Sequence, residues 1–177
     1  VFHGGPAGLT ANPTQPAADA ADTIVGANTH PTPYTMQLGI HVVPAGDVNG
    51  DGLGDLIATS NFFTNPEPHE GGVFVFLGRS GGIPSSLVSP VEEVADFVIE
   101  GNTASLFLGQ DRPEAGDVNG DGFSDLVLGA SHYANGELNE GAVFIYHGGA
   151  ESLADEADAR YDGQIADDWL GTTSASA

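Results

Sequence analysis

The sequence predicts an all-β fold, a β-propeller whose blades are four-stranded antiparallel sheets, and three observations support this prediction. The segment AGDVNGDG occurs twice, at Ala45–Gly52 and Ala115–Gly122, so eight identical residues recur 70 positions apart. Short runs rich in Val, Ile and Phe follow each copy, and 26 glycines and 11 prolines supply the turns between them. No helical periodicity is sustained, and residues 150–159 are expected to form at most a short surface turn.

The repeated unit contains several predicted strands. Gly71–Gly78 (GGVFVFLG) matches Gly141–Gly148 (GAVFIYHG), again 70 residues apart, so no gap separates the two copies. Runs of β-branched and aromatic residues bounded by glycines are typical of strands. On this basis we expect strands at 56–59, 73–77 and 95–101 in one unit, at 126–128, 143–146 and 159–165 in the next, and at 21–27 in an earlier, partial unit.

The repeat divides the chain into about two full blades and two partial ones. We expect the third and fourth strands of a partial blade at 1–37, full blades at 38–107 and 108–169, and the first strand of a further blade at 170–177. The proline-rich runs at 10–18 and 82–90 are then loops within blades. A propeller ring needs about four to eight blades. The chain is therefore expected to self-associate as a dimer or trimer, or to be completed by the remaining blades of a parent propeller.

The duplicated acidic loop predicts two calcium sites. Calcium takes six to eight oxygen ligands, and alternate residues of a tight loop can all point inward to provide them. Oxygen-bearing side chains occupy positions one, three, five and nine of each loop, and a backbone carbonyl at position seven would complete the set. The expected ligands are Asp47, Asn49, Asp51, Leu53 and Asp55 in the first loop and Asp117, Asn119, Asp121, Phe123 and Asp125 in the second.

Two other interpretations of this loop agree less well with the sequence. A single stretch rich in Asp, Asn and Gly is often only a turn whose side chains bind local amides, but the duplication with identical spacing favours a metal site. An EF-hand loop would have a bidentate Glu at position twelve, where this chain has Ala58 and Leu128. EF-hand and dockerin loops also run into helices, whereas strand-like residues follow both loops here.

The repeated unit resembles the FG-GAP repeat of the integrin α-subunit propeller and its bacterial relatives. The FG element corresponds to Leu38–Gly39 and Leu108–Gly109, and the GAP element to Gly129–Ala130–Ser131; in the first unit it has decayed to Ala58–Thr59–Ser60. The resemblance implies that each calcium loop lies between the first and second strands of a blade. It also implies that the metal has a mainly structural role, and that ligands bind the opposite face of the propeller or a blade edge.

The charge excludes some classes of partner. The chain has 25 acidic residues and three basic ones, with a formal net charge of −22, so it repels nucleic acid and anionic membranes. No apolar run approaches the roughly 20 residues of a membrane span. Because the chain opens on Val-Phe-His without methionine, we expect a processed product or an excised fragment. Calcium loops and the lack of cysteine favour an extracellular or cell-surface location.

The sequence favours a non-catalytic module that presents loops to a protein or glycan. It lacks a G-x-S-x-G nucleophile motif, a cysteine and a phosphate-binding glycine loop. The alternative is an accessory portion of an extracellular carbohydrate- or lipid-active enzyme, or a lectin-like propeller. His3, His41 and His147 are expected to be structural, and Trp169 to pack between blades rather than stack on a sugar. His69 and His132, near Glu67, Glu70, Glu137 and Glu140, could bind a second cation, although they lack zinc-like spacing.

Overall fold

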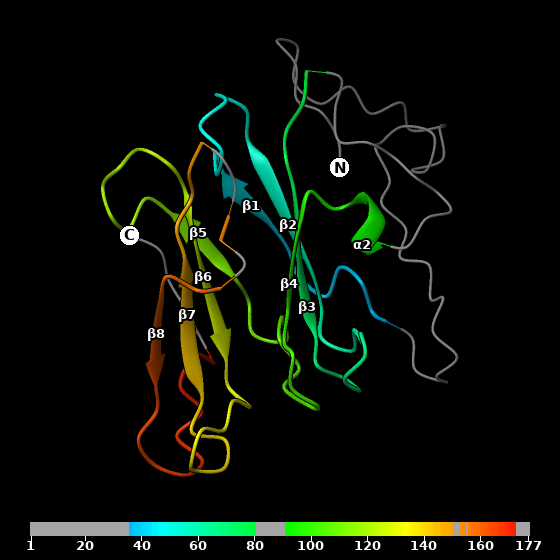
Figure 1. Cartoon of the computed structure of the whole chain (residues 1–177), viewed down its shortest axis with the longest axis vertical. Helices are drawn as coiled ribbons and strands as arrows, with labels where there is room; N and C mark the ends of the chain where they lie inside the picture. Colours follow the sequence, from blue (N-terminus) through cyan, green and yellow to red (C-terminus); the bar gives the residue numbers. More distant parts are fainter. Residues whose placement is uncertain (1–35, 81–90, 151–152, 155, 173–177) are drawn as a thin grey trace, which may run out of the picture.

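The computed structural model describes residues 36–80, 91–150, 153–154 and 156–172, which form two antiparallel sheets side by side (Figure 1). Each sheet has four strands in sequential order. The first sheet contains β1 (Val42–Gly46), β2 (Asp55–Ser60), β3 (Gly72–Phe76) and β4 (Phe97–Glu100). The second contains β5 (Glu114–Gly116), β6 (Asp125–Ala130), β7 (Ala142–Tyr146) and β8 (Ala159–Asp162). The predicted all-β class, with four-stranded antiparallel blades, is confirmed.

Strand lengths differ from the prediction at the fourth strand of each sheet. The predicted strands at 95–101 and 159–165 are shorter, and each ends immediately before a glycine, Gly101 or Gly163. A Cβ on these glycines would lie 2.2 Å from the Glu70 carbonyl oxygen and 1.9 Å from that of Glu140. The chain therefore turns where another backbone segment approaches too closely for any side chain.

One short helix was not predicted. It is α2 (Val91–Val94), a single turn whose Val91 is fully buried with Phe74 and Phe76 of β3. A four-residue segment is too short to show helical periodicity, so no sequence pattern could identify it. The predicted strand at 21–27 and the predicted loops at 10–18 and 82–90 lie outside the described residues.

The first sheet is buried on both faces. Ile57, Val73 and Val75 point toward the second sheet and form one core with its Leu126 and Leu128. On the opposite face, the buried side chains of Ala58, Phe74 and Phe76 pack with Met36, Leu38 and Val91. All five residues of β3 are consequently buried, as expected for a sheet packed between two layers.

The sheets lie closest where β1 approaches β5. The Ser124 amide donates to the Asp47 carbonyl at 2.9 Å, and the Asp47 amide donates to Ser124 Oγ at 3.1 Å. A third hydrogen bond joins the Gly149 amide to the Val48 carbonyl at 2.9 Å. A Cβ on Gly50 would lie 2.4 Å from the Phe123 ring. The first acidic loop therefore packs directly against the second.

A Leu-Gly element ties each sheet to the segment that follows it. Leu108 bridges to Gly71 and Leu170 bridges to Gly141, both in parallel, at the equivalent edge of each sheet. The Leu108 amide donates to the Glu70 carbonyl at 2.9 Å, and the Leu170 amide donates to that of Glu140 at 3.2 Å. Phe107 and Trp169, which precede these leucines, both have a φ of 55°. The connection is thus repeated in backbone conformation as well as in sequence.

Candidate functional site

The two acidic loops occupy equivalent places in the two sheets. The first connects β1 to β2 and the second connects β5 to β6, so strands flank both loops. Strands on both sides contradict an EF-hand or a dockerin, in which helices would flank the loop.

Each loop folds around the same set of side-chain to amide hydrogen bonds. In the first, Asp47 accepts from the amides of Asp51 and Gly52 at 3.0 and 2.9 Å, and Asp51 accepts from that of Leu53 at 2.8 Å. In the second, the corresponding distances are 3.0, 3.0 and 2.9 Å. Asn49 and Asn119 also accept from the amide two residues ahead. The side chains at positions one, three and five therefore all turn into the loop.

The aspartate at position nine has a different environment. Asp55 and Asp125 are buried, with 4% and 0% exposure. The Asp55 carboxylate accepts from the amides of Val48 and Gly78, both at 2.7 Å. Asp125 accepts from the amides of Val118 and Gly148 at 2.8 and 2.9 Å. Each carboxylate thus fastens its acidic loop to the residues that follow β3 or β7.

The pKa values reflect these two environments. Burial raises the pKa of Asp55; hydrogen bonds from Gly78 and Val48 oppose the shift, and the nearby charges of Asp51 and Asp47 add to it. The pKa of the exposed Asp121 is lowered by hydrogen bonds from the Phe123 amide and the Asn119 side chain, and by the charge of His147. The second loop therefore has an exposed anionic rim, which contains Asp121, and a buried anchor, Asp125, to which Asp55 corresponds in the first loop.

The donor chemistry of the loops fits a hard cation. Every predicted ligand is an oxygen, and a carboxylate that accepts one amide per oxygen keeps further lone pairs. The three arginines form ion pairs outside the loops, with Asp96, Glu114 and Asp162. The carboxylates nevertheless face the loop's own amides, and in the part of the chain that the structure describes no three His, Cys, Asp or Glu side chains are grouped as metal ligands. The calcium ligands stay a prediction.

His147 lies beside the second loop, a position that the sequence did not identify as part of the site. Its Nδ1 is 2.5 Å from Asn119 Nδ2 and 3.9 Å from Asp125 Oδ1. The matching residue of the first unit, 70 positions earlier, is Leu77. The two loops therefore differ in one neighbouring group that can carry a positive charge. The sequence signal that could have identified His147 is the difference between the two repeats, His147 against Leu77, at the end of the strand beside the loop.

The loops before β3 and β7, which contain His69 and His132, have a different arrangement. Glu70 and Glu140 are buried, and each accepts from a backbone amide of its own loop, that of Asn65 or Asn135. Burial raises the pKa of Glu70, opposed by the hydrogen bonds from Asn65 and Asn102. These two buried carboxylates therefore stabilise the conformation of their loops by accepting hydrogen bonds from the loop backbone.

His69 and His132 belong to a row of aromatic rings that crosses both sheets at this end. His69 stacks on Phe107 with centroids 5.9 Å apart, and Phe107 meets His132 edge to face at 5.2 Å. His132 in turn meets Trp169 edge to face at 5.0 Å, and Trp169 is 39% exposed. Of the other histidines, His41 lies 2.9 Å from the Gln110 carbonyl through Nε2, and His3 is outside the described residues.

Comparison with known proteins identifies the repeat. A family model described as FG-GAP repeat matches residues 40–76 and 113–146. The chain is 34% identical to integrin alpha-PS2 of Drosophila melanogaster over 108 residues and 31% identical to integrin alpha-4 of Xenopus laevis over 121 residues. It is also 31% identical to phosphatidylinositol-glycan-specific phospholipase D of Rattus norvegicus over 109 residues. These matches cover 58%, 68% and 60% of this chain.

The chain spans only a small part of these relatives, namely 7%, 11% and 13% of their respective lengths. Among the residues that the structure describes, no helix has the length and apolar character needed to cross a membrane. The predicted FG-GAP resemblance is confirmed.

Replacing the buried anchor tests its structural role separately from any metal. Asp125→Ala would leave the Val118 and Gly148 amides without their acceptor, and each such loss costs about 1–3 kcal/mol. We expect the free energy of unfolding, measured by urea titration in EDTA, to fall by at least about 2 kcal/mol. Asp168→Ala, which removes an exposed carboxylate, is the control and should change it by less than about 0.5 kcal/mol. Equal effects of the two substitutions would contradict the anchoring role.

Proposed function

We propose that this chain, which is built from FG-GAP repeats of the integrin α-subunit type, is a calcium-stabilised part of an extracellular β-propeller that serves in adhesion, ligand binding or scaffolding. The observation that carries the proposal is the duplicated acidic loop, with the same side-chain hydrogen bonds in both sheets. Because the first loop packs on the second at the junction of the sheets, a cation there would stabilise the junction as well as each loop.

Calcium would be held by the oxygen ligands predicted from the sequence. The metal would supply positive charge to three carboxylates in each loop, in a chain whose formal net charge is −22. Ordered loops would in turn fix the amides of Ser124 and Gly149 that bind the first loop's backbone. Calcium binding is therefore expected to contribute to the stability of the folded chain.

Removing one carboxylate charge from each loop tests the calcium proposal. Asp51→Asn with Asp121→Asn keeps the size of the side chains but weakens both sites. We expect the calcium affinity, measured by isothermal titration calorimetry, to fall at least tenfold, because losing even an outer-shell partner of a metal lowers affinity by about that factor. Calcium should raise the melting temperature of the unmodified chain and EDTA should reverse the rise. The control, Asp168→Asn, removes the same charge elsewhere and should leave affinity unchanged. A melting temperature that is the same in calcium and EDTA would contradict the proposal.

One face of the second sheet is open, which supports a multi-blade assembly. Val118 and Tyr161 are 45% and 61% exposed, and Val127, Val143 and Ile145 are only partly buried. The equivalent residues of the first sheet are all buried in the core between the sheets; they are Val48, Ile57, Val73, Val75 and Ile99. The occupant of the open face would therefore be another blade of the same type, supplied by a second or third copy of the chain or by a longer parent protein.

Sedimentation measurements distinguish self-association from a monomer. We expect the chain in calcium to sediment as a dimer or trimer, and Val143→Asp with Tyr161→Asp to shift it to the monomer, because a charge on the open face opposes burial. Leu138→Asp, which changes a 68% exposed residue in a loop, is the control and should leave the mass unchanged. If the unmodified chain is a monomer at every concentration, self-association is wrong and the parent protein would supply the missing blades.

A second candidate function is an accessory role in a larger enzyme. The similarity to phosphatidylinositol-glycan-specific phospholipase D favours it, because the chain matches 13% of the length of a protein named as an enzyme. We infer that this chain itself is not the catalytic part. Turnover of phospholipid or polysaccharide by the purified chain would contradict that inference, whereas stimulation of a separate catalytic domain would favour the accessory role.

A further inference from the structure

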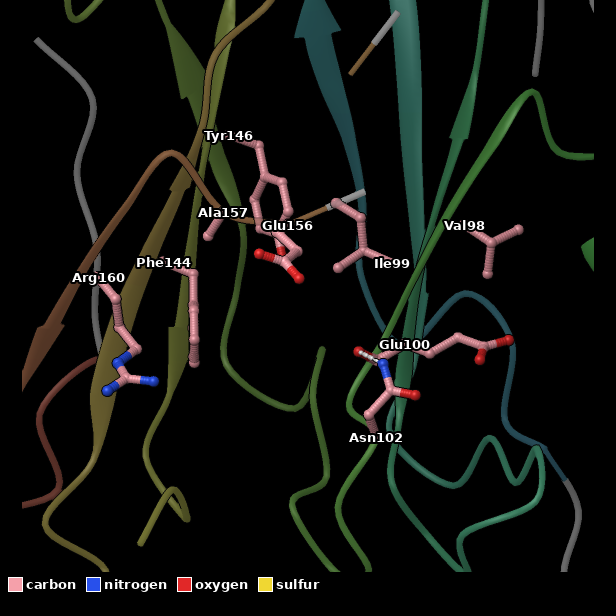
Figure 2. Close-up of a pocket in the computed structure, with 9 residues that line it drawn as sticks. All are labelled: Val98, Ile99, Glu100, Asn102, Phe144, Tyr146, Glu156, Ala157 and Arg160. Carbon is pink, nitrogen blue, oxygen red and sulfur yellow. Dashed lines mark hydrogen bonds between the residues drawn. The ribbon is translucent and has the colours of Figure 1, made fainter. Parts of the chain in front are cut away.

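A cavity of about 480 Å³ lies between the two sheets (Figure 2), and no residue of the acidic loops lines it. Ile99 of β4 forms one wall, and Phe144 and Tyr146 of β7 form the other. In Figure 2 the Glu156 carboxylate lies between Tyr146 and Ile99, while Val98 points away from the cavity. Its volume is within the roughly 300–1,000 Å³ of small-molecule sites. The sheets lie closest at β1 and β5, so the cavity forms where they diverge toward the outer strands.

The residues of this cavity differ in character from the equivalent face of the first sheet. Arg160 pairs with Phe144 across the strands in the register in which Val98 pairs with Phe74. In the same alignment of the units, Tyr146 corresponds to Phe76 and Glu156 to Val94. Three apolar residues of the first unit, of which Val94 lies in α2, therefore correspond to a phenol, a guanidinium and a carboxylate in the second.

The polar groups of the second sheet differ in exposure: Glu156 and Arg160 are exposed, whereas Tyr146 is buried. On the first sheet the face is closed, and Phe74 and Phe76 are fully buried beneath Val91. Leu153 is the equivalent of Val91 and is also buried, so the covering residue is retained while the polar groups open a cavity beside it. Because they are exposed, Glu156 and Arg160 can be hydrated in the free chain and carry no penalty of unpaired burial. A molecule bound in the cavity would therefore have to replace the hydrogen bonds that water can make to these groups.

The charge around the cavity disfavours an anionic ligand. Asp162 binds the Arg160 guanidinium through two contacts, from Nε at 2.8 Å and Nη2 at 3.0 Å, and the guanidinium lies 5.3 Å from the centroid of the Tyr133 ring. Its charge is thus compensated and its position fixed. Glu156 forms no ion pair among the described residues, so the lining carries net negative charge in a strongly acidic chain.

The remaining chemistry matches a polyhydroxylated molecule. Glu156 accepts hydrogen bonds, the Asn102 amide offers both a donor and an acceptor, and burial raises the pKa of Tyr146, which keeps its phenol protonated. The rings of Phe144 and Tyr146 and the side chain of Ile99 provide an apolar surface between these groups. A sugar ring presents hydroxyl groups at its edge and C–H groups on its faces, so it would satisfy both kinds of contact.

We propose that the cavity between β4 and the β7–β8 pair binds a neutral saccharide of one or two units. This names a ligand class for the binding role proposed above and rests on that role, but it uses none of the predicted calcium ligands. The calcium proposal can therefore be correct while the saccharide proposal is wrong. The first fails if calcium does not change the melting temperature, and the second fails if no neutral sugar binds.

The test is a titration of the calcium-loaded full chain with defined sugars, followed by NMR of amide and aromatic signals. The panel contains glucose, galactose, mannose, N-acetylglucosamine and their disaccharides, with N-acetylneuraminic acid and glucuronic acid as anionic probes and cadaverine as a cationic one. We expect saturable binding of at least one neutral sugar, with shifts confined to residues such as Asn102 and Tyr146. Anionic sugars should bind at least about tenfold more weakly.

Variants that restore the residues of the first sheet provide the decisive arm. Tyr146→Phe with Arg160→Val should retain the melting temperature, because the first sheet folds with those residues, but abolish binding. Glu156→Gln should weaken binding at least about tenfold, and Glu137→Gln, an exposed carboxylate elsewhere, should not. The proposal is overturned if no neutral sugar binds at saturating concentration, if binding survives Tyr146→Phe with Arg160→Val, or if cadaverine binds in preference to every sugar.

Discussion

The structure depends on one constraint: a four-stranded sheet of this repeat has two apolar faces and cannot bury both of them by itself. The first sheet meets the constraint, because the second sheet covers one face and a cluster around Val91 covers the other. The second sheet meets it on one side only, and its Tyr161 is 61% exposed. Repeat proteins gain stability from such interfaces between neighbouring repeats. The stability of this chain therefore depends on the packing of one sheet against the next.

The acidic loops lie at the point where that packing is tightest. Ser124 of the second loop exchanges two hydrogen bonds with the backbone of Asp47 in the first. Buried anchors at Asp55 and Asp125 hold each loop to the residues after the third strand of its own sheet. Asp47 therefore belongs both to the charged loop, through its side chain, and to the junction, through its backbone. At the outer strands, where the sheets diverge, the polar lining of the cavity is free to differ between units without disturbing the junction.

The repeat predicted the sheets well because its signals are local. The position of β3 and β7 followed from runs of β-branched and aromatic residues between glycines, and the loop between two strands followed from the FG-GAP resemblance. Contacts between units were not predictable, since Ser124 and Asp47 are 77 residues apart and a serine in a turn has no distinctive signal. Asp55 was predicted only as a ligand, and its burial beneath the loop depends on the distant Gly78 amide. The blade boundaries and the calcium ligands stay predictions.

Hydrogen exchange at the junction amides tests the central claim, that calcium-ordered loops hold one unit on the next. The amides of Ser124 and Gly149 donate across the sheets, whereas the β6–β7 ladder lies within one sheet. Replacing calcium by EDTA should accelerate exchange at Ser124 and Gly149 by much more than in the ladder. Equal protection of these two amides in calcium and in EDTA would contradict the account.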